Sequence, residues 1–510
     1  MKFIRKNLLE ILTIIGIVIA YFLLRLSFFS SLPIFTDEAI YTRWAQIALN
    51  DASWRFISLT DGKQPLFVWV AMVFMKFIKD PLIAARLVSV FTGFFTVIGL
   101  WLLSFELFKN KKIAYLTSVI YVFYPFAQVY DRMALMDSMV ATFSIFALYF
   151  SILLVRKTKL SIMYTLGIVA GLGALTKSSN FFSLYLLPFT ILLFDFQKNT
   201  LVRRLFKWIA YVILSVVIAQ VMYNILRLSP LFQMIETKNA TFVYPFSEWI
   251  SHPFTFFVGN LHGLFDWLKS YLLAPYILLI IISLIFIYKF IKEKLLLIIY
   301  FLLPLVALAL FGKVIFPRFI FFMSCYLLPL AAWGLNEIIL FANRRLNGTN
   351  KIFSRSIIYV VITIIFTIYP GFVSFTVAKN PLNAPIAKSD INQYVNNWTA
   401  GWGVNESINF FKKEAENQKI FIATEGTFGL MPESLELYLV DNKNVTIKGY
   451  WPVENSLPQD AIDYAKKMPS YFVFYQPNNK VINPSYPLKL VSQIKMGNSN
   501  YFYRIYRIIP

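Results

Sequence analysis

Cysteine and histidine are scarce in this sequence, and their scarcity limits the kinds of site that it can hold. The single cysteine, Cys325, lies inside an apolar run, so no disulfide can form within one chain. The two histidines, His252 and His262, share one loop with no third ligand beside them in the sequence. A metal site there would need a carboxylate as well, and solvated loop histidines are the simpler interpretation.

Charged residues are also few, and acidic residues are the rarer kind. They make up 15% of the chain, with a formal net charge of +22. A strongly basic chain can be a nucleic-acid-binding protein. Here the basic residues stand in short clusters between apolar runs, which argues for a membrane protein and against nucleic acid as a partner. We find no internal repeat and no low-complexity segment.

Apolar residues, by contrast, are abundant. They make up 58% of the chain, against about 45–50% in soluble domains. Several runs reach about 20 apolar residues, enough to cross the bilayer core, and such unbroken runs are typical of helices rather than of barrel strands. The sequence predicts eleven transmembrane helices, at residues 7–29, 82–108, 113–129, 133–155, 160–176, 180–196, 208–226, 270–288, 295–312, 318–341 and 356–377.

The basic clusters predict the orientation of these helices. With eleven spans, the N-terminus and alternate connectors share one side and carry nearly all the clustered lysine and arginine, with Glu293 as the only clear acid. The positive-inside rule puts that side in the cytoplasm. A further apolar segment, 65–77, is too short to cross comfortably. Because counting it as a span would scramble the charge pattern, we expect an interfacial or re-entrant helix on the outer side.

The chain changes character after the last span. Residues 1–378 are predicted to form the transmembrane domain, with a first outer loop at 30–81. From 379 to 510 the apolar runs shorten to strand length, at 419–424, 435–440, 444–450, 471–475 and 500–508, around one amphipathic helix at 405–417. The predicted fold class is therefore an α-helical polytopic membrane protein, N-terminus inside and C-terminus outside, with a C-terminal soluble α/β domain on the outer side.

Ionisable residues recur at one predicted depth on the outer side, where charge is costly and indicates function. Cations there could hold a phosphate by charge-assisted hydrogen bonds, and a nearby carboxylate could accept a proton from an attacking hydroxyl. Together they would suit an anionic, lipid-linked substrate. The set comprises Asp37 and Glu38 after the first span, Lys63 in the first loop, Arg132 and Asp137 after the third, Lys177 after the fifth, and Lys313 and Arg318 after the ninth.

Simpler interpretations stand beside this one. A lone lysine such as Lys177 or Lys313 can be an interfacial anchor whose amine reaches water. Arg318 could pair with a carboxylate inside the bundle, and Asp131 could cap or solvate a helix end. The acid pair at 37–38 fits the first turn of an amphipathic helix, where the helix dipole favours it. That explanation leaves the matching acid and bases in three other loops unexplained.

At these residues the sequence resembles the GT-C polytopic glycosyltransferases. It is most similar to the branch that contains protein O-mannosyltransferases and lipid A aminoarabinose transferases. The ordered elements cover about residues 7 to 341, and QYVNNWTAGWGVNESINFF also resembles the start of the outer domain in bacterial members. The elements are TDEAIY, DGKQPLFVW, ARLVSVFTGFFTVIGLWLL, DRMALMD, GLGALTKSSN and GKVIFPRFIFFMSCYLLPLAAWGL.

The resemblance implies a role for each residue of the set. Asp37 would orient or deprotonate the acceptor, with Glu38 supporting its loop and Asp137 as a further acid of the site. The family's Lys-Pro-Pro pattern reads Lys63-Gln64-Pro65 here, a departure from the family. Nothing in the sequence demands a metal or another cofactor, although the acids would allow a divalent metal. The donor phosphate would be bound by Lys63, Arg132, Lys177, Lys313 and Arg318.

The predicted function is that of an inverting glycosyltransferase in the plasma membrane. It would move a sugar from a polyprenyl-phosphate donor to a hydroxyl of an envelope glycan, lipid or protein on the non-cytoplasmic face. A lipid phosphate leaves readily when positive charge meets the charge developing on it. Two other classes stay open. A transporter or flippase of a lipid-linked anionic glycan would usually show inverted repeats, and a non-catalytic polysaccharide-assembly protein would not need acid and base in separate loops.

Overall fold

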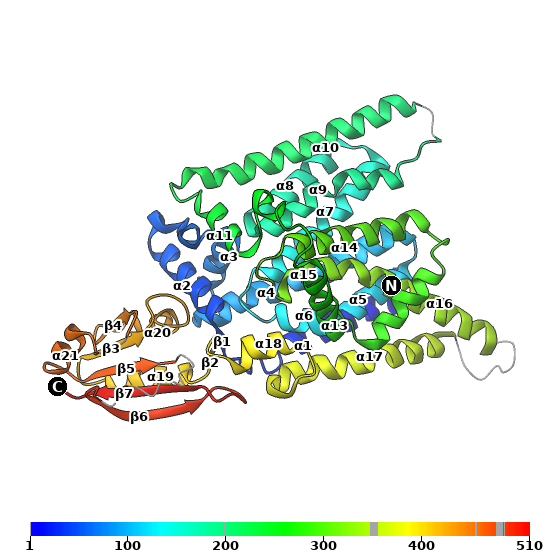
Figure 1. Ribbon diagram of the computed structural model, residues 1–510. Coiled ribbons are helices and arrows are strands. Elements are labelled where there is room, and N and C mark those ends of the chain that lie inside the picture. The colour runs from blue at the N-terminus through cyan, green and yellow to red at the C-terminus, as the bar shows by residue number, and fades with distance from the viewer. Residues whose placement is uncertain (1, 198–199, 347–354, 454–455, 476–482, 484) are drawn as a thin grey trace.

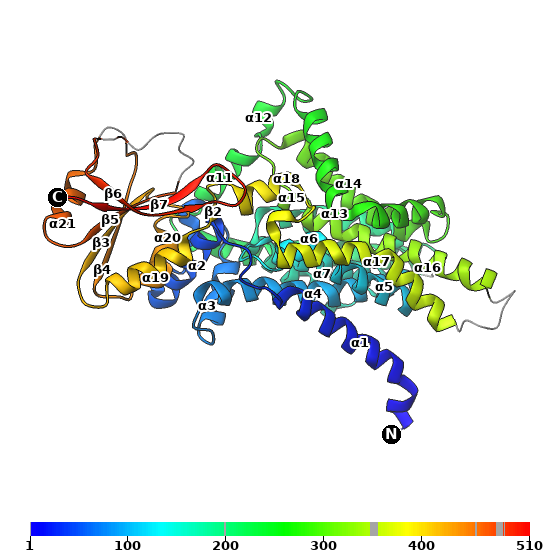
Figure 2. The ribbon, with the colours of Figure 1, turned by 90° about the horizontal axis from the view of Figure 1, so that it is seen from below.

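The chain folds into a long bundle of helices with a mixed α/β domain at one end (Figure 1). The computed structural model describes residues 2–197, 200–346, 355–453, 456–475, 483 and 485–510. The N-terminus lies with the bundle and the C-terminus in the α/β domain. Seen from below, α1 (Lys2–Leu26) extends from one side of the bundle and α12 (Phe246–Trp249) projects on the other (Figure 2).

Helical structure covers the apolar runs that were predicted as spans. In the described residues, seven helical segments are long and apolar enough to cross a membrane. This confirms a polytopic helical membrane protein; the exact number of spans and their orientation stay predictions. The seven segments contain α4 (Pro81–Phe108), α7 (Asp137–Lys157), α10 (Leu201–Tyr223), α13 (Phe257–Ile285), α14 (Ile291–Phe311), α15 with α16 (Arg318–Ser324 and Leu328–Leu346) and α17 (Arg355–Lys379).

Shorter helices fill the remaining predicted spans and the outer loops. The 180–196 span is irregular, because it is built mostly from 3-10 turns. The 65–77 segment forms a helix of only ten residues, α3 (Leu66–Met75), which packs on α2 (Thr36–Asn50) and α4 and is too short to cross about 30 Å of hydrocarbon. The others are α5 (Lys111–Val122), α6 (Pro125–Tyr130), α8 (Leu160–Thr176), α9 (Phe182–Tyr185) and α11 (Met234–Phe242).

One long helix is broken near its middle. Within α13, Leu273 takes φ 57° and ψ 165°, and Pro275 follows two residues later. Proline removes a backbone donor and clashes with the preceding turn, so a break here is expected. The predicted span 270–288 begins at this break, which separates it from the part of α13 that carries the exposed pair His262 and Asp266.

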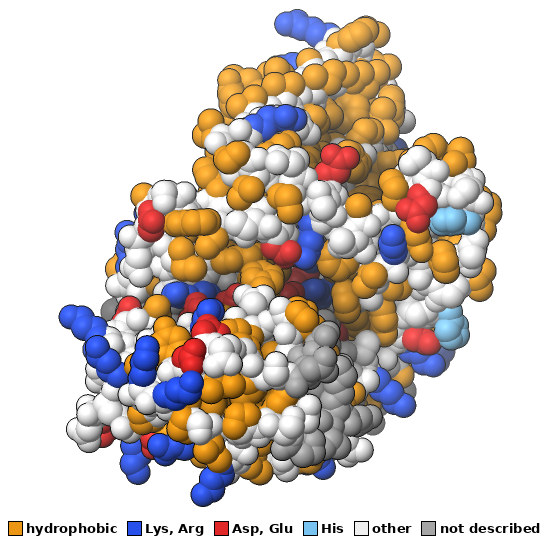
Figure 3. All heavy atoms as spheres, turned by 60° about the vertical axis from the view of Figure 1, so that its left-hand side comes forward, with side chains coloured by type: hydrophobic (Ala, Val, Ile, Leu, Met, Phe, Trp, Pro, Cys, Tyr) orange, Lys and Arg blue, Asp and Glu red, His pale blue; other side chains and the backbone are white. Residues whose placement is uncertain are grey.

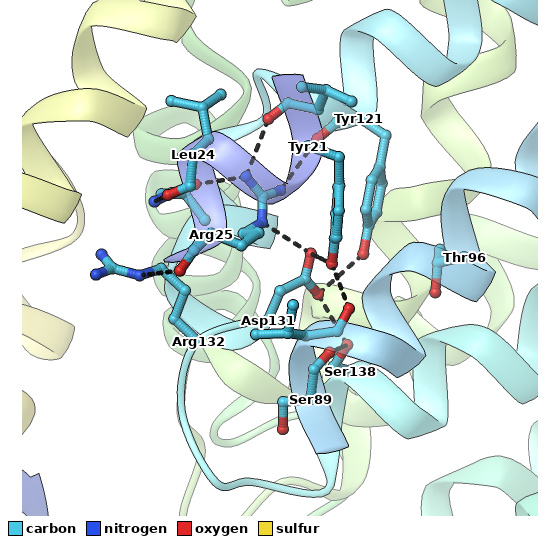
Figure 4. A network of polar contacts seen from close by, with 12 residues as sticks. Tyr21, Leu24, Arg25, Ser89, Thr96, Tyr121, Asp131, Arg132 and Ser138 are labelled. Carbon is cyan, nitrogen blue, oxygen red and sulfur yellow. Dashed lines mark hydrogen bonds and ion pairs between the residues drawn. The ribbon is translucent and has the colours of Figure 1, made fainter. Parts of the chain in front are cut away.

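A buried polar network joins the end of α1 to the helices beside it (Figure 4). The Arg25 Nε donates to Asp131 Oδ2 at 3.1 Å, and neither side chain is exposed. The hydroxyls of Tyr121 and Ser138 donate to Asp131 Oδ1 at 3.0 and 2.8 Å. Asp131 is the C-cap residue of α6, as a helix-end position would have it, but its buried side chain shows that the interpretation as a solvated residue is wrong. A carboxylate at this depth needs a cation and several donors to offset its desolvation.

The C-terminal domain is a five-stranded sheet with helices on both faces. The strand order is β4-β3-β5-β7-β6, with β3, β4 and β5 parallel and β6 and β7 antiparallel to their neighbours. Helices α19 and α20 contribute to the core on one face, and α21 to the core on the other. The bounds are α19 (Val404–Glu414), β3 (Ile420–Glu425), α20 (Glu433–Leu439), β4 (Val445–Tyr450), α21 (Gln459–Ala465), β5 (Ser470–Phe474), β6 (Leu488–Lys495) and β7 (Phe502–Ile508).

One detail of this domain differs from the sequence prediction. The run at 435–440 is not a strand but belongs to α20, because Leu435 and Leu439 lie four residues apart and are buried together in the helix-covered core. The boundary at 378/379 falls beside the end of α17, yet Ala387 and Tyr394 beyond it still pack in the core of the helical bundle. The segment after α17 therefore joins the two parts closely rather than serving as a loose linker.

Candidate functional site

A cavity of about 390 Å³ lies where several predicted outer loops meet. Its lining residues come from α2, the start of α7, α11, α14 and α15. They also come from residues 62–64, which we call the Lys63 loop, and from residues 177–179, which we call the Lys177 turn. On this face the molecule is hollowed between the helices and the C-terminal domain, with basic and acidic side chains gathered around the hollow (Figure 3). Segments up to 281 residues apart thus meet at one place, as the recurring outer-side charges predicted.

Three ion pairs lie at this cavity; their cations and Asp137 line it, whereas Asp37 and Asp61 border it. Arg318 Nη1 lies 2.7 Å from Asp37 Oδ2, and Lys177 Nζ lies 2.7 Å from Asp137 Oδ1. The third pair joins Lys238 Nζ to an oxygen of the Asp61 carboxylate at 2.6 Å. The first two pairs unite four of the residues that the sequence singled out. Arg318 does pair with a carboxylate, and that carboxylate belongs to the predicted site.

Lys63 differs from the other cations of the cavity. Among the described residues it has no carboxylate partner, and its ammonium group instead lies 5.2 Å from the centre of the Phe242 ring. Burial lowers the pKa of Lys63 to about 8; Asp37 opposes this shift, and the positive charges of Arg318 and Lys177 add to it. A partly desolvated cation among other cations is well suited to receive an anion.

Asp37 is held at the start of α2. It stands in the first helical turn, where the helix dipole favours a negative charge. Burial alone would raise the pKa of Asp37, but the positive charges of Arg318 and Lys63 outweigh burial and leave this pKa below its ordinary value. Asp37 is therefore ionised, and about a fifth of its side-chain surface remains exposed.

Glu38 does not line the cavity, and its grouping with the catalytic acids stays a prediction. It is fully buried, and both carboxylate oxygens bind Arg86 at 2.8 Å. The same oxygens accept the backbone amides of Phe35 at 3.0 Å and Ala134 at 2.7 Å. With every acceptor position used, Glu38 fixes the start of α2 against α4 and the Arg132 turn. This geometry agrees with the supporting role expected for its loop.

Arg132 is likewise absent from the cavity lining, and its assignment to the donor phosphate stays a prediction. It is 1% exposed and donates to the backbone carbonyls of Arg25, Ser27 and Phe28. Those carbonyls belong to the end of α1 and the turn after it, where helix carbonyls lack partners of their own. Arg132 therefore caps the end of α1, and Figure 4 shows its guanidinium group beside the Arg25 carbonyl.

Lys313 also lies outside the cavity lining. Its side chain is exposed, with the ammonium group 5.3 Å from the centre of the Tyr244 ring. Its neighbour Gly312 and the facing Phe242 do line the cavity, so Lys313 stands at the rim. The interpretation of Lys313 as an interfacial anchor fits this position better than a direct contact with phosphate.

Much of the rest of the cavity lining is apolar. It is formed by side chains of α14 and α15, with Phe182 from α9 and Phe242 from α11. Exposed apolar side chains of α14, such as Leu302 and Leu303, continue outward from the same helix. The cavity thus combines cations with hydrocarbon, and the Lys63 and Lys177 ammonium groups lie against the Phe242 and Phe319 rings. The apolar wall comprises Pro304, Ala307, Leu308, Phe311, Phe319 and Phe322.

Sequence reasoning missed several residues of this site. Lys238, with its partner Asp61, lines or borders the cavity although both stand in predicted outer loops. Tyr41 lines it one turn along α2 from Asp37. Gln64, which replaces a proline of the family pattern, donates to Ser178 Oγ at 2.7 Å and so ties the Lys63 loop to the Lys177 turn. Lys238 stood in a predicted outer loop with no signal that it would reach the cavity, and nothing in the sequence indicated the bond made by Gln64.

The histidines do not build a metal site with their neighbours. His252 packs against the rings of Tyr244 and Phe256, and His262 pairs with Asp266 at an exposed position. In the part of the chain that the structure describes, no three residues among His, Cys, Asp and Glu are grouped as metal ligands would be.

Comparison with protein families agrees with the resemblance predicted from the sequence. Residues 62–223 match a family model described as dolichyl-phosphate-mannose-protein mannosyltransferase. This segment contains the Lys63 loop, the Arg132 turn and the Lys177 turn. No curated protein sequence matches the chain significantly.

Solved structures extend the likeness to nearly the whole chain. The crystal structure of ArnT from Cupriavidus metallidurans in the apo state aligns with a TM-score of 0.60 and 15% identity, covering 99% of this chain and 98% of that chain. The structure of the same protein bound to undecaprenyl phosphate aligns with a TM-score of 0.56 and 14% identity, with the same coverage. A third structure is the archaeal oligosaccharyltransferase AglB from Archaeoglobus fulgidus in complex with an inhibitory peptide and a dolichol-phosphate. It aligns with a TM-score of 0.53 and 13% identity, covering 92% of this chain and 69% of that chain. The protein therefore has an ArnT-like fold, a helical membrane part with a C-terminal α/β domain.

Proposed function

We propose that this protein is an inverting glycosyltransferase that takes a sugar from a polyprenyl-phosphate donor and transfers it to a hydroxyl group of an envelope acceptor. The observation that carries the proposal is the arrangement around Lys63. Lys63, which has no carboxylate partner among the described residues, and the Asp37–Arg318 pair lie at one cavity whose lining is largely apolar. A lipid phosphate would need both the cation and the apolar surface. That ArnT was solved with undecaprenyl phosphate and AglB with a dolichol-phosphate supports this class of donor.

The donor phosphate would be bound by Lys63 and Arg318. Charge-assisted hydrogen bonds from an ammonium and a guanidinium group match the oxygens of a phosphate. The Arg318 Nε is buried without a partner among the described residues, so this guanidinium has a donor to spare. Lys177 would add positive charge from its pair with Asp137. The isoprenoid chain would follow the apolar wall of α14 toward the membrane.

Binding of the donor would also activate Asp37. While Arg318 is paired with Asp37, the carboxylate is a weak base. A phosphate that draws the guanidinium toward itself weakens this pairing and raises the basicity of Asp37. The donor therefore has to bind before Asp37 can accept a proton, which keeps the acceptor from being deprotonated in the absence of the sugar.

The transfer step then balances as a direct displacement. The acceptor O–H gives its proton to Asp37 as its oxygen forms a bond to the anomeric carbon of the sugar. The bond from that carbon to the phosphate oxygen breaks, and the electron pair leaves with the lipid phosphate. Lys63 and Arg318 stabilise the charge that develops there. Attack opposite the leaving phosphate inverts the configuration at the anomeric carbon.

The site needs no cofactor for this chemistry in our proposal, because its cations can serve the leaving group; a divalent metal that assists the phosphate would be compatible with it. We propose that the reaction occurs on the non-cytoplasmic face of the plasma membrane. The clustering of basic residues in the opposite connectors supports that placement. The acceptor would be a glycan, a lipid or a protein.

The proposal is tested with purified protein in liposomes that contain radiolabelled polyprenyl-phosphate sugars and an envelope extract as acceptor. Transfer of label from lipid to acceptor by the wild type, and its loss in Asp37→Asn, is the expected result. Equal transfer by both proteins would overturn the role of Asp37. Movement of labelled lipid between leaflets without transfer would instead indicate a flippase.

A further inference from the structure

The strand that leads into Asp37 is held by the segment that precedes the C-terminal α/β domain. Strand β1 (Ile34–Phe35) pairs antiparallel with β2 (Ala400–Gly401), and the two lie between the bundle and the sheet (Figure 1). The backbone amide and the hydroxyl of Thr36 both donate to the Thr399 carbonyl at 3.1 Å. Asp37 is the next residue. Its backbone position therefore depends on residues more than 360 positions later in the chain.

We call residues 390–401 the brace, because they contact both the bundle and β1. The brace begins at Asp390, whose side chain is fully buried. The hydroxyls of Tyr130 on α6 and Tyr271 on α13 both donate to Asp390 Oδ2, the former at 2.8 Å. These two tyrosines fix the start of the brace to two helices of the membrane part.

The middle of the brace contacts the strand that leads into the site. The Tyr394 ring meets the Phe35 ring edge-on, with centroids 4.8 Å apart. The Tyr394 hydroxyl lies 3.2 Å from that of Tyr130, so it belongs to the same network as Asp390. One continuous segment therefore runs from a fixed point in the bundle to the residue two positions before Asp37.

The same network reaches the partner of Asp37. The Tyr130 ring stacks on Phe321 with centroids 5.5 Å apart and an interplanar angle of 28°. Phe321 stands one turn after Arg318 on α15. Tyr130 thus contacts the brace through its hydroxyl and the Arg318 helix through its ring. The two members of the Asp37–Arg318 pair are positioned from one cluster.

A segment that merely joined two domains would not require a buried carboxylate. Burying a carboxyl group without a cation is costly, and its Oδ1 has no hydrogen-bond partner among the described residues. Burial raises the pKa of Asp390 to about 7, and the two tyrosine hydroxyls lower it only in part. A buried hydrogen-bond acceptor at this point lowers the stability of the fold, which fits a role in positioning the residues around it.

We infer that the brace is the positioning element of the transfer reaction, with Asp390 and Tyr394 as positioning residues that hold Asp37 against Arg318. The inference rests on the function proposed above. A base displaced by about 1 Å from its acceptor can lose roughly 100-fold in rate. The brace thereby gives the connection to the C-terminal domain a part in catalysis, although no described residue of that domain lines the cavity.

The test compares Asp390→Ala with Asp390→Asn in the full-length protein. Asparagine keeps an oxygen that accepts the tyrosine hydroxyls, whereas alanine removes it. Hydrogen–deuterium exchange of the peptide that contains residues 33–38 reports on β1, and transfer kinetics report on Asp37. For Asp390→Ala we expect the Thr36 amide to exchange at least about 10-fold faster and kcat to fall about 10- to 100-fold, with the KM for the donor unchanged. Asp390→Asn should stay near the wild type in both measurements.

Two further variants keep the test decisive if Asp390→Ala fails to fold. Tyr271→Phe removes one donor to Asp390 without changing the ring, and should give a smaller change in the same direction. Asp463→Ala, at an exposed position on α21, is the matched control and should change nothing. Unaltered exchange at Thr36 in both Asp390→Ala and Tyr271→Phe would overturn the brace. Hydrogen–deuterium exchange can be measured without any transfer activity. Absence of transfer by the wild type would therefore count against the proposed function, and unaltered exchange in the variants would count against the brace.

Discussion

The Arg318 guanidinium donates to the Asp37 carboxylate at 2.7 Å and joins two residues that lie 281 positions apart. In our account this contact separates two states of the site. With the pair closed, Asp37 is ionised but weakly basic; with a phosphate bound to Arg318, Asp37 is free to accept a proton. The order of events, donor before acceptor, follows from this one ion pair.

Replacing Asp37 by asparagine should lower kcat for sugar transfer by about 100- to 10,000-fold, the usual contribution of a general base. Because Asp37 does not bind the donor, the dissociation constant of the polyprenyl phosphate should stay the same or decrease as Arg318 is released. Steady-state kinetics and a lipid-binding assay give the two values. Asp51→Asn, at an exposed position after the same helix, serves as the matched control. A loss of donor binding in Asp37→Asn would contradict the assignment.

Lys63 and Lys313 should respond differently to the same substitution. Removing a charge-assisted hydrogen bond costs about 1.5–3 kcal/mol, so Lys63→Met should weaken binding of a polyprenyl phosphate by roughly 10- to 100-fold. Lys313→Met should change it little, because Lys313 stands exposed at the rim. Titration of both variants in the same detergent or nanodisc makes the comparison. Equal losses would mean that the phosphate lies nearer the rim than the cavity geometry indicates.

Donor affinity should fall as the pH rises through about 8. An amine loses its positive charge above its pKa, and burial has lowered that of Lys63 to about 8. Binding of a polyprenyl phosphate should therefore be constant between pH 6.5 and 7.5 and weaken by pH 9. In Lys63→Arg, whose guanidinium stays charged, the decrease should disappear. A profile that is the same in both proteins would show that another group titrates.

Glu38 and Arg86 should matter for folding rather than for donor binding. Arg86→Leu leaves the Glu38 carboxylate buried with only its backbone donors. Removing one partner of a buried ion pair costs about 3–5 kcal/mol, so the thermal unfolding temperature should drop clearly. The double variant Glu38→Leu/Arg86→Leu should be less destabilised than Arg86→Leu alone. A double variant that is less stable than both single variants would contradict this interpretation.

The sequence could predict the helical class and much of the site because charge at a membrane edge is informative. Asp37, Asp137, Lys177 and Arg318 stand at one predicted depth, and the structure pairs them as two salt bridges. The depth of a residue in the membrane does not determine which way its side chain points. Arg132 shares that depth, yet it turns toward the carbonyls at the end of α1.

Other parts of the site could not be read from the sequence. Asp390 lies in a tail that carries no membrane signal, and its partners Tyr130 and Tyr271 are 260 and 119 residues away. Lys238 lay in a predicted outer loop, but only packing of α11 on the Lys63 loop shows that it borders the cavity: a Cβ on Gly62 would stand 2.6 Å from that of Lys238. Contacts of this kind depend on tertiary packing, which periodicity and composition do not encode.

The most direct measurement is an electron cryomicroscopy structure of the protein with undecaprenyl phosphate. The account predicts phosphate density within about 3 Å of the Lys63 ammonium and the Arg318 guanidinium, with the isoprenoid chain along α14 and the Asp37–Arg318 contact lengthened. Phosphate density at Lys313 or elsewhere, with the Asp37–Arg318 contact intact and the cavity beside Lys63 empty of lipid, would contradict it.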